Sequence, residues 1–248
     1  MDHNFMHQTA IVTGAASGIG HAISIKLLEN GAAVYALDMD EQRLDEAFRT
    51  ADRKPVAITI DVTNEKMVNE VINTIIAAVK QVHILVNCVG ITGITNIKSH
   101  EVETANLQQV FNVNFMSSFF TSKAVLPHMV LHNYGRILHL ASIAGKEGNA
   151  GMLAYSTSKA AMIAMAKVQG KEYGETGVTI NALAPAVVRT PLVDMMPDAQ
   201  VKYMTDKIPM KRCGTLEEAA NMALYIVSTA NSFTTGFTFD LSGGRATY

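Results

Sequence analysis

The sequence has 248 residues, of which 48% are hydrophobic and 17% are charged, and its formal net charge at pH 7 is -2. A chain of this size can bury a compact core without disulfides or metals, so one globular domain over 1–248 is expected. The near-neutral charge argues against a nucleic-acid or anionic-membrane partner and favours small molecules.

The cysteines and histidines give no indication of disulfide bonds or of a metal site. Cys88 and Cys213 cannot build a disulfide framework, and the eight histidines show no metal-ligand spacing. The first residues contain no apolar signal segment, and no run reaches the roughly 18 apolar residues of a membrane span. We therefore expect a cytoplasmic protein without a bound metal.

Seven short apolar runs recur along the chain, and each is predicted to be a strand buried on both faces. They lie at 9–14, 32–38, 56–62, 83–90, 135–142, 178–185 and 236–243. Segments with helical periodicity lie between them, among others at 19–31, 64–80, 118–130 and 215–230. This alternation predicts a single-domain α/β Rossmann fold, a doubly wound seven-stranded parallel sheet flanked by helices.

The first strand runs directly into TGAASGIG at 13–20, which opens a helix. Gly14, Gly18 and Gly20 would allow a tight turn and the close approach of a pyrophosphate to the free N–H groups of the helix. With Ser17 and Ile19 in the same turn, this segment is predicted to bind a dinucleotide.

Asp38 ends the second strand, eighteen positions after Gly20. A carboxylate there accepts hydrogen bonds from both ribose hydroxyls and repels a 2′-phosphate, so NAD is the expected cofactor rather than NADP. Asp38 as a helix N-cap is the alternative. Asp61 and Val62 end the third strand and are predicted to meet the adenine in the same way.

The connection at 189–212 interrupts the alternation between the sixth and seventh strands and contains three prolines. Insertions at the carboxyl end of a parallel strand often carry ligand-binding lids. We therefore predict a substrate lid here, with an irregular surface connection as the alternative.

Further motifs follow at regular places: NCVG at 87–90, FNVNF around Asn114, Ser142 thirteen positions before Tyr155, Lys159 four positions after it, and PAVVRT at 185–190. Together with the glycine-rich turn, they resemble the short-chain dehydrogenase/reductase family over essentially the whole chain. The resemblance implies an NAD-dependent oxidoreductase that transfers a hydride between a secondary alcohol or ketone and the nicotinamide. It also implies a homotetramer.

By this resemblance, the catalytic residues are Asn114, Ser142, Tyr155 and Lys159. Ser142 would bind the substrate oxygen, Asn114 would hold a water that links Lys159 to solvent, and Tyr155 would be the general base. A phenol has a pKa near 10, so the neighbouring ammonium and the oxidised nicotinamide are expected to lower it. Each residue also has a purely structural alternative: a cap at a helix break for Asn114, a strand end for Ser142 and a solvated side chain for Lys159.

The resemblance also extends the set of cofactor contacts. Lys159 would bind the nicotinamide ribose, and Thr190 with the Val188 backbone would hold the carboxamide. The remaining expected contacts are Asn87, Gly90, Tyr155 and Pro185. Cys88, Val89 and Ala186 depart from the family pattern beside the cofactor, which affects affinity more than chemistry.

Substrate residues are predicted from their place after the fifth strand and in the lid: Ser142, Glu147, Asn149, Tyr155 and Arg189. Other hydrogen-bonding side chains nearby are Lys146, Lys202, Tyr203, Lys207, Lys211 and Arg212. So many polar groups favour a sugar acid or a polyol over a steroid, because unpaired donors against an apolar ligand are costly.

The segments at 99–103, 141–152 and 237–248 resemble dehydrogenases of bacterial sugar catabolism that act on 2-keto-3-deoxy sugar acids, such as L-rhamnonate or L-fuconate derivatives. Arg245 and Tyr248 would, by resemblance, approach a neighbouring subunit's active site. The alternatives are a 3-oxoacyl-[acyl-carrier-protein] reductase, which Asp38 disfavours, and a non-catalytic nucleotide sensor, which Tyr155 and Lys159 disfavour.

Overall fold

The computed structural model describes residues 4–246, and its centre is one parallel sheet. The strand order is β3-β2-β1-β4-β5-β6-β7, and every pair is parallel. The strands are β1 (Thr9–Thr13), β2 (Ala33–Asp38), β3 (Val56–Thr59), β4 (Ile84–Asn87), β5 (Gly135–Leu140), β6 (Val178–Pro185) and β7 (Thr238–Leu241). The predicted Rossmann architecture is therefore confirmed.

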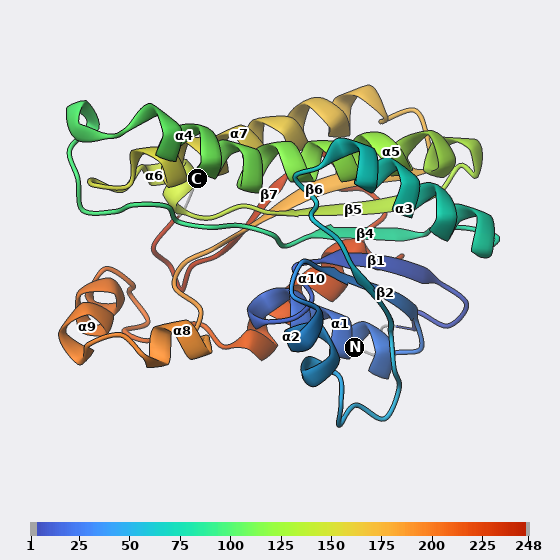
Figure 1. Cartoon of the computed structure of the whole chain (residues 1–248), viewed down its shortest axis with the longest axis horizontal. Helices are drawn as coiled ribbons and strands as arrows, with labels where there is room; N and C mark the ends of the chain where they lie inside the picture. Colours follow the sequence, from blue (N-terminus) through green and yellow to red (C-terminus); the bar gives the residue numbers. More distant parts are fainter. Residues whose placement is uncertain (1–3, 247–248) are drawn as a thin grey trace.

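Helices cover both faces of the sheet (Figure 1). One face carries α1 (Gly18–Glu29), α2 (Glu41–Ala47) and α10 (Leu216–Val227). The other carries α3 (Glu65–Ala78), α4 (Thr104–Phe111), α5 (Ser117–Leu131) and α7 (Leu153–Glu172). Each layer of helices buries its own apolar cluster against one face of the sheet, so the sheet lies between two apolar cores.

Short elements occupy the connections at the carboxyl ends of the strands. They are the 3₁₀ turn η1 (Ser99–Glu101), α6 (Ala144–Glu147), α8 (Pro191–Asp194) and α9 (Asp198–Asp206). A further short element, the π-helical turn η2 (Asn112–Met116), joins α4 to α5. The predicted lid region thus contains two helices, α8 and α9, which lie beside the sheet's carboxyl edge in Figure 1.

The prediction that all strands are buried on both faces is wrong for β3. Val56 is 52% exposed, and Ala57 and Thr59 are also exposed. The reason is its place in the sheet, because β3 is an edge strand with a neighbour on one side only.

The order of the strands reverses between β1 and β4, so the connections that follow these two strands diverge to opposite faces of the sheet. A crevice at such a switch point is where open parallel sheets bind their ligands. Within residues 4–246, no helix has the length and apolar character that crossing a membrane would demand.

Candidate active site

The glycine-rich turn after β1 is tight and brings the backbone close to the beginning of α1. Gly14 and Gly18 have φ angles of +66° and +55°, which residues with a side chain rarely adopt. A Cβ atom at Gly20 would overlap the carbonyl oxygen of Gly14. Ser17 precedes α1 without capping it through its side chain, so the first N–H groups of the helix remain available to an anion.

A cleft of about 700 Å³ opens beside this turn, at the carboxyl ends of β1, β2, β3 and β4. Its volume falls in the usual range for a small-molecule site. It is lined by most of the predicted cofactor residues, namely Gly14, Ser17, Gly18, Ile19, Gly20, Asp38, Asp61, Val62, Gly90 and Thr190. The predicted residues outside this lining are Asn87, Tyr155, Lys159, Pro185 and Val188.

Asp38 is held in place by two backbone N–H groups. Ala16 donates to its Oδ2 at 3.0 Å and Asp40 donates to its Oδ1 at 3.2 Å. The N-cap of α2 is Asp40, whose side chain accepts from the backbone N–H of Arg43. The alternative of Asp38 as a helix cap is thereby excluded, and its carboxylate lines the cleft at the end of β2.

Asp61 and Val62 line the cleft beyond the end of β3. Asp61 is exposed, and its Oδ1 accepts from both the backbone and the hydroxyl of Thr63. Val62 is buried at 5% exposure and supplies an apolar wall.

Sequence reasoning missed Arg43, which also lines the cleft close to Asp38. Its Nε lies 3.5 Å from Asp40 Oδ2, and the side chain is 70% exposed. The sequence contains a signal that could have identified this residue. Asp40 is a typical N-cap residue, and Arg43 follows three positions later, in the first turn of the helix that Asp40 begins.

Lys159 is buried at 3% exposure, which excludes the solvated alternative. Its ammonium donates to the carbonyl oxygen of Leu140 at 2.6 Å and approaches Met162 Sδ at 3.6 Å. Burial lowers the pKa of Lys159 to about 8, and the nearby thiol of Cys88 acts weakly in the other direction. Lys159 Nζ also lies 5.9 Å from the centre of the Tyr155 ring, as the four-residue helical spacing predicts.

The expectation that Lys159 lowers the pKa of Tyr155 is wrong for the protein by itself. Burial raises the pKa of this phenol, and a hydrogen bond with Ser142 opposes the shift only in part. Loss of water around the phenolate is therefore the main effect on this pKa, and the opposing effect comes from Ser142 rather than from Lys159. The phenol is the form present at neutral pH.

Asn114 lies in the π-helical turn η2 and is fully buried. Its Oδ1 accepts from Ile91 N at 2.7 Å, and its Nδ2 donates to Ile91 O at 3.0 Å and to Ser158 Oγ at 2.9 Å. The helix does not break here, because η2 joins α4 to α5 without a gap. π-helical turns within longer helices are frequent at functional sites.

Gly90 lies next to both Asn114 and Lys159. A Cβ atom at Gly90 would lie 3.2 Å from Lys159 Nζ and 3.3 Å from Asn114 Oδ1. Because Gly90 has no side chain, the Lys159 amine and the Asn114 carboxamide can both lie close to the backbone that follows β4.

Ser142 follows β5 and is 8% exposed. Its Oγ accepts from the backbone N–H of Ala144 at 3.1 Å at the beginning of α6. Ser142 and Tyr155 thus come together from two elements, the end of β5 and the first turn of α7.

Pro185 ends β6, and the loop after it is tied to the chain before α10. Val188 pairs with Gly214, and the N–H of Arg189 donates to Gly214 O at 2.8 Å. Thr190 caps α8 and lies next to the glycine-rich turn, where a Cβ atom at Gly18 would be 3.8 Å from its methyl group. This loop therefore lies against the cleft.

Asn87 is predicted to bind the cofactor, but its side chain does not line the cleft. Its side chain is 1% exposed, its Oδ1 accepts from Thr121 Oγ1 at 2.8 Å, and its Nδ2 lies 3.2 Å from His139 Nδ1. These contacts are directed into the layer between the sheet and its helices, away from the cleft lining.

Glu147 and Asn149 both contact Arg245 of the carboxyl-terminal tail. Arg245 donates through Nε and Nη2 to Glu147 Oε2 at 3.0 and 2.7 Å, and Nη2 reaches Asn149 Oδ1 at 3.2 Å. The tail therefore fastens the loop that follows Ser142 within this chain. Tyr248 lies outside the described residues.

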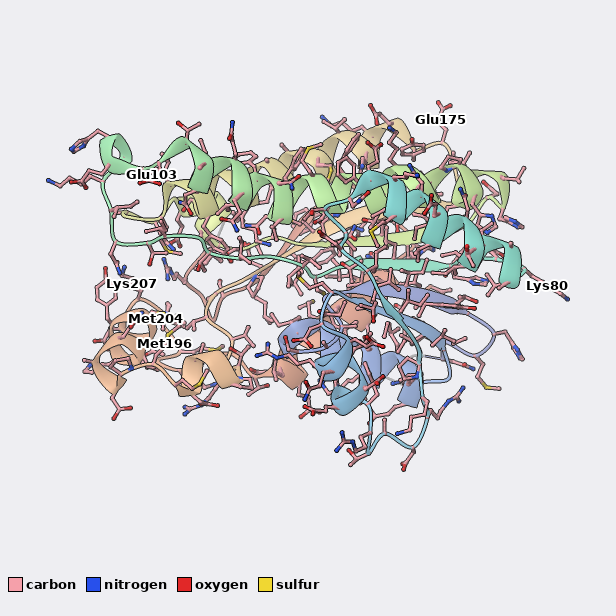
Figure 2. All side chains as sticks on the ribbon, in the orientation of Figure 1. Lys80, Glu103, Glu175, Met196, Met204 and Lys207 are labelled. Atoms are coloured by element: carbon pink, nitrogen blue, oxygen red, sulfur yellow. The ribbon has the colours of Figure 1, made fainter. Side chains whose placement is uncertain are left out.

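The other polar groups predicted to border the substrate are mostly engaged locally. Arg189 donates to Asp194 at 2.7 Å and is 65% exposed, so it is not gathered with Ser142 and Tyr155. Lys146 pairs with Asp240, Lys202 with Asp206, and Arg212 with Glu218. Figure 2 shows that the lid also carries methionines, of which Met196 and Met204 are labelled beside Lys207.

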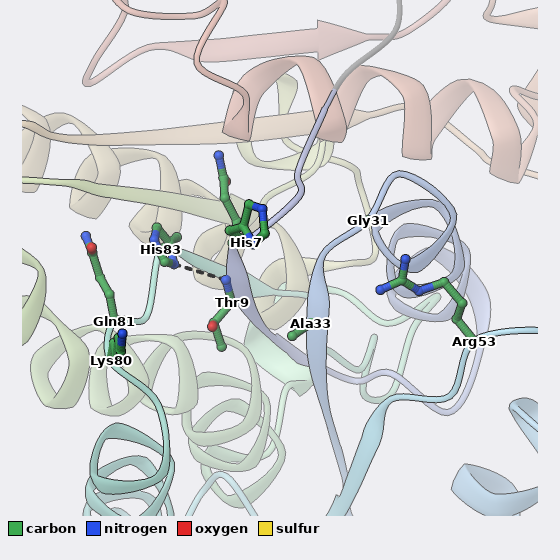
Figure 3. A pocket seen from close by; sticks show the side chains of 9 residues that line it. His7, Thr9, Gly31, Ala33, Arg53, Lys80, Gln81 and His83 are labelled. Carbon is green, nitrogen blue, oxygen red and sulfur yellow. Dashed lines mark hydrogen bonds between the residues drawn. The ribbon is translucent and has the colours of Figure 1, made fainter.

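A second cavity of about 460 Å³ lies at the opposite, amino-terminal edge of the sheet and contains none of the predicted site residues (Figure 3). His83, which lines it, accepts the backbone N–H of Thr9 through Nδ1 at 3.0 Å. This bond joins the beginnings of β1 and β4.

Comparisons with known proteins agree with this geometry. A family model described as "Enoyl-(Acyl carrier protein) reductase" matches residues 14–246. The 2-dehydro-3-deoxy-L-rhamnonate dehydrogenase (NAD(+)) of Sphingomonas sp. is 41% identical, over 96% of this chain and 95% of the relative. The 3-oxoacyl-[acyl-carrier-protein] reductase FabG of Thermotoga maritima is 31% identical, over 96% and 97%.

Two solved structures have the same overall fold. The crystal structure of gox2181 superposes with a TM-score of 0.93 at 27% identity and covers 98% of this chain and 97% of its own. ElxO with NADP bound superposes with a TM-score of 0.91 at 27% identity and covers 97% and 99%.

Proposed function

The chain belongs to the short-chain dehydrogenase/reductase family of oxidoreductases, and from this premise we propose that it is an NAD-dependent dehydrogenase of a 2-keto-3-deoxy sugar acid. In this proposal, residues 1–248 form one nucleotide-binding domain with a substrate lid at 189–212. A homotetrameric assembly and a cytoplasmic location are part of the same proposal.

The preference for NAD is the part that a single observation carries, namely the carboxylate of Asp38 at the ribose end of the cleft. Two backbone N–H groups hold it, so it cannot easily turn away from a 2′-phosphate. The Sphingomonas relative carries NAD(+) in its name, which supports the same cofactor. The glycine-rich turn and the uncapped beginning of α1 fit the pyrophosphate of either dinucleotide.

The sugar-acid substrate is supported by the same relative, which acts on 2-dehydro-3-deoxy-L-rhamnonate and matches nearly the whole chain. The polar loop with Glu147 and Asn149 supports it as well. Most cations of the lid are paired with neighbouring carboxylates, and Glu147 and Asn149 are held by Arg245, so the relative is the main support for a sugar-acid substrate.

The bound nicotinamide would supply the hydride acceptor in oxidation and the hydride donor in reduction. In oxidation, the Tyr155 phenolate takes the proton of the alcohol hydroxyl, and in reduction the phenol returns it to the ketone oxygen. Ser142 donates its hydroxyl proton to the same substrate oxygen. Lys159 binds the nicotinamide ribose and keeps a positive charge near the phenol, and Asn114 connects this amine to solvent through a water.

The proposal is tested with the purified protein, NAD+ or NADP+, and 2-dehydro-3-deoxy-L-rhamnonate, while absorbance of the reduced cofactor is recorded. We expect turnover with NAD+ and a lower kcat/KM with NADP+ by at least about a hundredfold. Turnover of 3-oxoacyl thioesters with NADPH, and none of the sugar acid, would instead establish the reductase activity that the Thermotoga relative's name describes. Saturable cofactor binding without turnover on a panel of alcohols and ketones would instead favour a nucleotide sensor.

A further inference from the structure

Four polar side chains form a buried chain of hydrogen bonds behind the proposed active site. Thr121 of α5 donates to Asn87 Oδ1 at 2.8 Å, and Asn87 Nδ2 lies 3.2 Å from His139 Nδ1. His139 Nε2 lies 3.0 Å from Gln169 Oε1 of α7. The chain crosses two strands and two helices, and none of its members is more than 8% exposed.

The partners determine where the protons of His139 lie. The Asn87 carboxamide turns its Oδ1 toward the Thr121 hydroxyl, and its Nδ2 donates to Ser118 O at 3.5 Å, so an N–H of the same Nδ2 faces His139 Nδ1. The remaining proton of a neutral imidazole is then on Nε2, and it is donated to Gln169 Oε1. A second ring proton would face the Asn87 donor, so this network requires the neutral ring.

The network ends next to the atom that holds Lys159. The carbonyl oxygen of Leu140, the residue after His139, accepts from Lys159 Nζ at 2.6 Å. Among residues 4–246, Lys159 forms no ion pair, so this carbonyl is its main polar partner. Helix α7 is therefore attached to two consecutive residues of β5, through Gln169 to His139 and through Lys159 to Leu140.

We propose that His139 is a positioning residue, which fixes α7 against β5 and thereby sets the place of the Lys159 amine beside Tyr155. This inference rests on the proposed function of Lys159 and Tyr155. An imidazole that merely filled the core would be replaceable by an apolar side chain without any change at Lys159. A positioning residue must instead be replaced by a group that both accepts from Asn87 and donates to Gln169.

The test compares His139→Leu, which removes both hydrogen bonds, with His139→Gln, which can accept from Asn87 and donate to Gln169. For His139→Leu we expect kcat to fall at least tenfold at pH 7. The pKa of the Lys159 amine, read by NMR of ¹³Cε-labelled lysine without cofactor, should fall by at least half a unit. His139→Gln should restore both readouts to within about threefold and 0.2 units of the unsubstituted protein.

Asn181→Leu is the matched control, because Asn181 is also fully buried, and its side chain bonds to Thr234 and Phe237 and to no other residue in 4–246. It should reduce stability and leave the lysine pKa unchanged. A lysine pKa that is the same in His139→Leu and in the unsubstituted protein, or that moves equally in Asn181→Leu, would overturn the proposal.

If His139→Leu fails to fold, Gln169→Leu removes the same contact from the helix side and must lower the lysine pKa likewise. Tyr155→Phe is measured in parallel to separate the two hypotheses. If that variant keeps its turnover, the proposed function fails. If it loses turnover while His139→Leu behaves like the unsubstituted protein, only the positioning role fails.

Discussion

Burial, more than the proximity of a charge, governs the acid–base groups of the site. It raises the pKa of Tyr155 and lowers the pKa of Lys159 to about 8, so both side chains are driven toward their neutral forms. A protonated phenol is ready to donate to a ketone oxygen. Alcohol oxidation needs the phenolate, so its rate should rise as the pH increases above neutrality.

Replacing Tyr155 by Phe should abolish turnover in both directions, because it removes the hydroxyl that exchanges a proton with the substrate oxygen in the proposed mechanism. We expect kcat to fall by at least roughly a thousandfold. The change is measured by initial rates of NADH formation at pH 7 and pH 9. A variant that kept a tenth of the activity would show that Tyr155 is not the acid–base group.

Cofactor choice is also decided at the residue scale. In Asp38→Asn the side chain keeps one acceptor for Ala16 N or Asp40 N but loses the charge that repels a 2′-phosphate. One unit-charge pair at about 4 Å and an effective dielectric near 20 is worth roughly 4 kcal/mol. The ratio of kcat/KM for NAD over NADP should therefore fall on the order of a hundredfold or more.

Two controls accompany this variant. Asp40→Asn alters a carboxylate at the same end of the cleft, which caps α2, and should change the cofactor ratio far less. Adding Arg43→Ala to Asp38→Asn should remove part of the gain with NADP, because Arg43 is the cation among the residues that line the cleft. An unchanged ratio in Asp38→Asn would disprove the role of Asp38.

At the scale of elements, hydrophobic patterning predicts the positions of the seven strands, and the glycine-rich turn predicts where the cleft lies. Patterning could not show that β3 is an edge strand, because exposure depends on which strand lies beside it. Nor could it show the π-helical turn around Asn114, which joins two helices and is anchored by Ile91, 23 positions away.

The buried network was invisible for a related reason. Asn87, His139 and Gln169 are far apart in sequence, and each alone has the appearance of an ordinary polar residue at the end of a strand or on a helix. The NCVG motif predicts a cofactor contact for Asn87, whereas its side chain bonds toward α5 and β5. Long-range pairing of this kind becomes visible only when the strands and helices are packed together.

Gly90→Ala tests how closely the β4 end, η2 and α7 must approach. The new Cβ would lie 3.2 Å from Lys159 Nζ and 3.3 Å from Asn114 Oδ1, so these groups must move by a few tenths of an ångström. We expect kcat to fall about tenfold, since small displacements of positioned groups are costly. The free energy of unfolding should change by less than about 1 kcal/mol.

Gly174→Ala is the matched control, because its Cβ would meet its nearest atoms at an ordinary 3.5 Å and lies beyond the end of α7. Activity should be retained there. Equal kcat values for Gly90→Ala and the unsubstituted protein would mean that the close approach at Gly90 has no part in turnover.

At the scale of the whole molecule, three histidines connect elements through nitrogen atoms that accept hydrogen bonds. His83 accepts from Thr9 N, His128 accepts from Val82 N at 3.1 Å, and His139 accepts from Asn87. Burial is the main reason that the pKa of each lies below 6.5, and for His139 the pKa falls to about 4. Hydrogen bonds with Gln81 and Gln169 raise the pKa of His83 and His139 in part, and the charge of Lys159 lowers the pKa of His139.

Stability should therefore depend on pH in a defined window. Because the folded pKa of His139 lies below the unfolded value of 6.5, the unfolded chain takes up the proton first as the pH falls. The contribution is complete above pH 6.5 and is lost progressively toward pH 4. For His139 alone, the free energy of unfolding should drop by about 2 kcal/mol between pH 7 and pH 5.

Urea denaturation at pH 7, 6 and 5 measures this loss, and His139→Gln isolates it from the titration of carboxylates. The variant has no ring to protonate, so its free energy of unfolding should fall less steeply over the same interval. The difference between the two slopes, integrated from pH 7 to pH 5, should amount to the same 2 kcal/mol or so. Parallel curves for the two proteins would mean that His139 accepts its proton as readily in the folded chain as in the unfolded one, and the buried neutral ring between Asn87 and Gln169 would then be disproved.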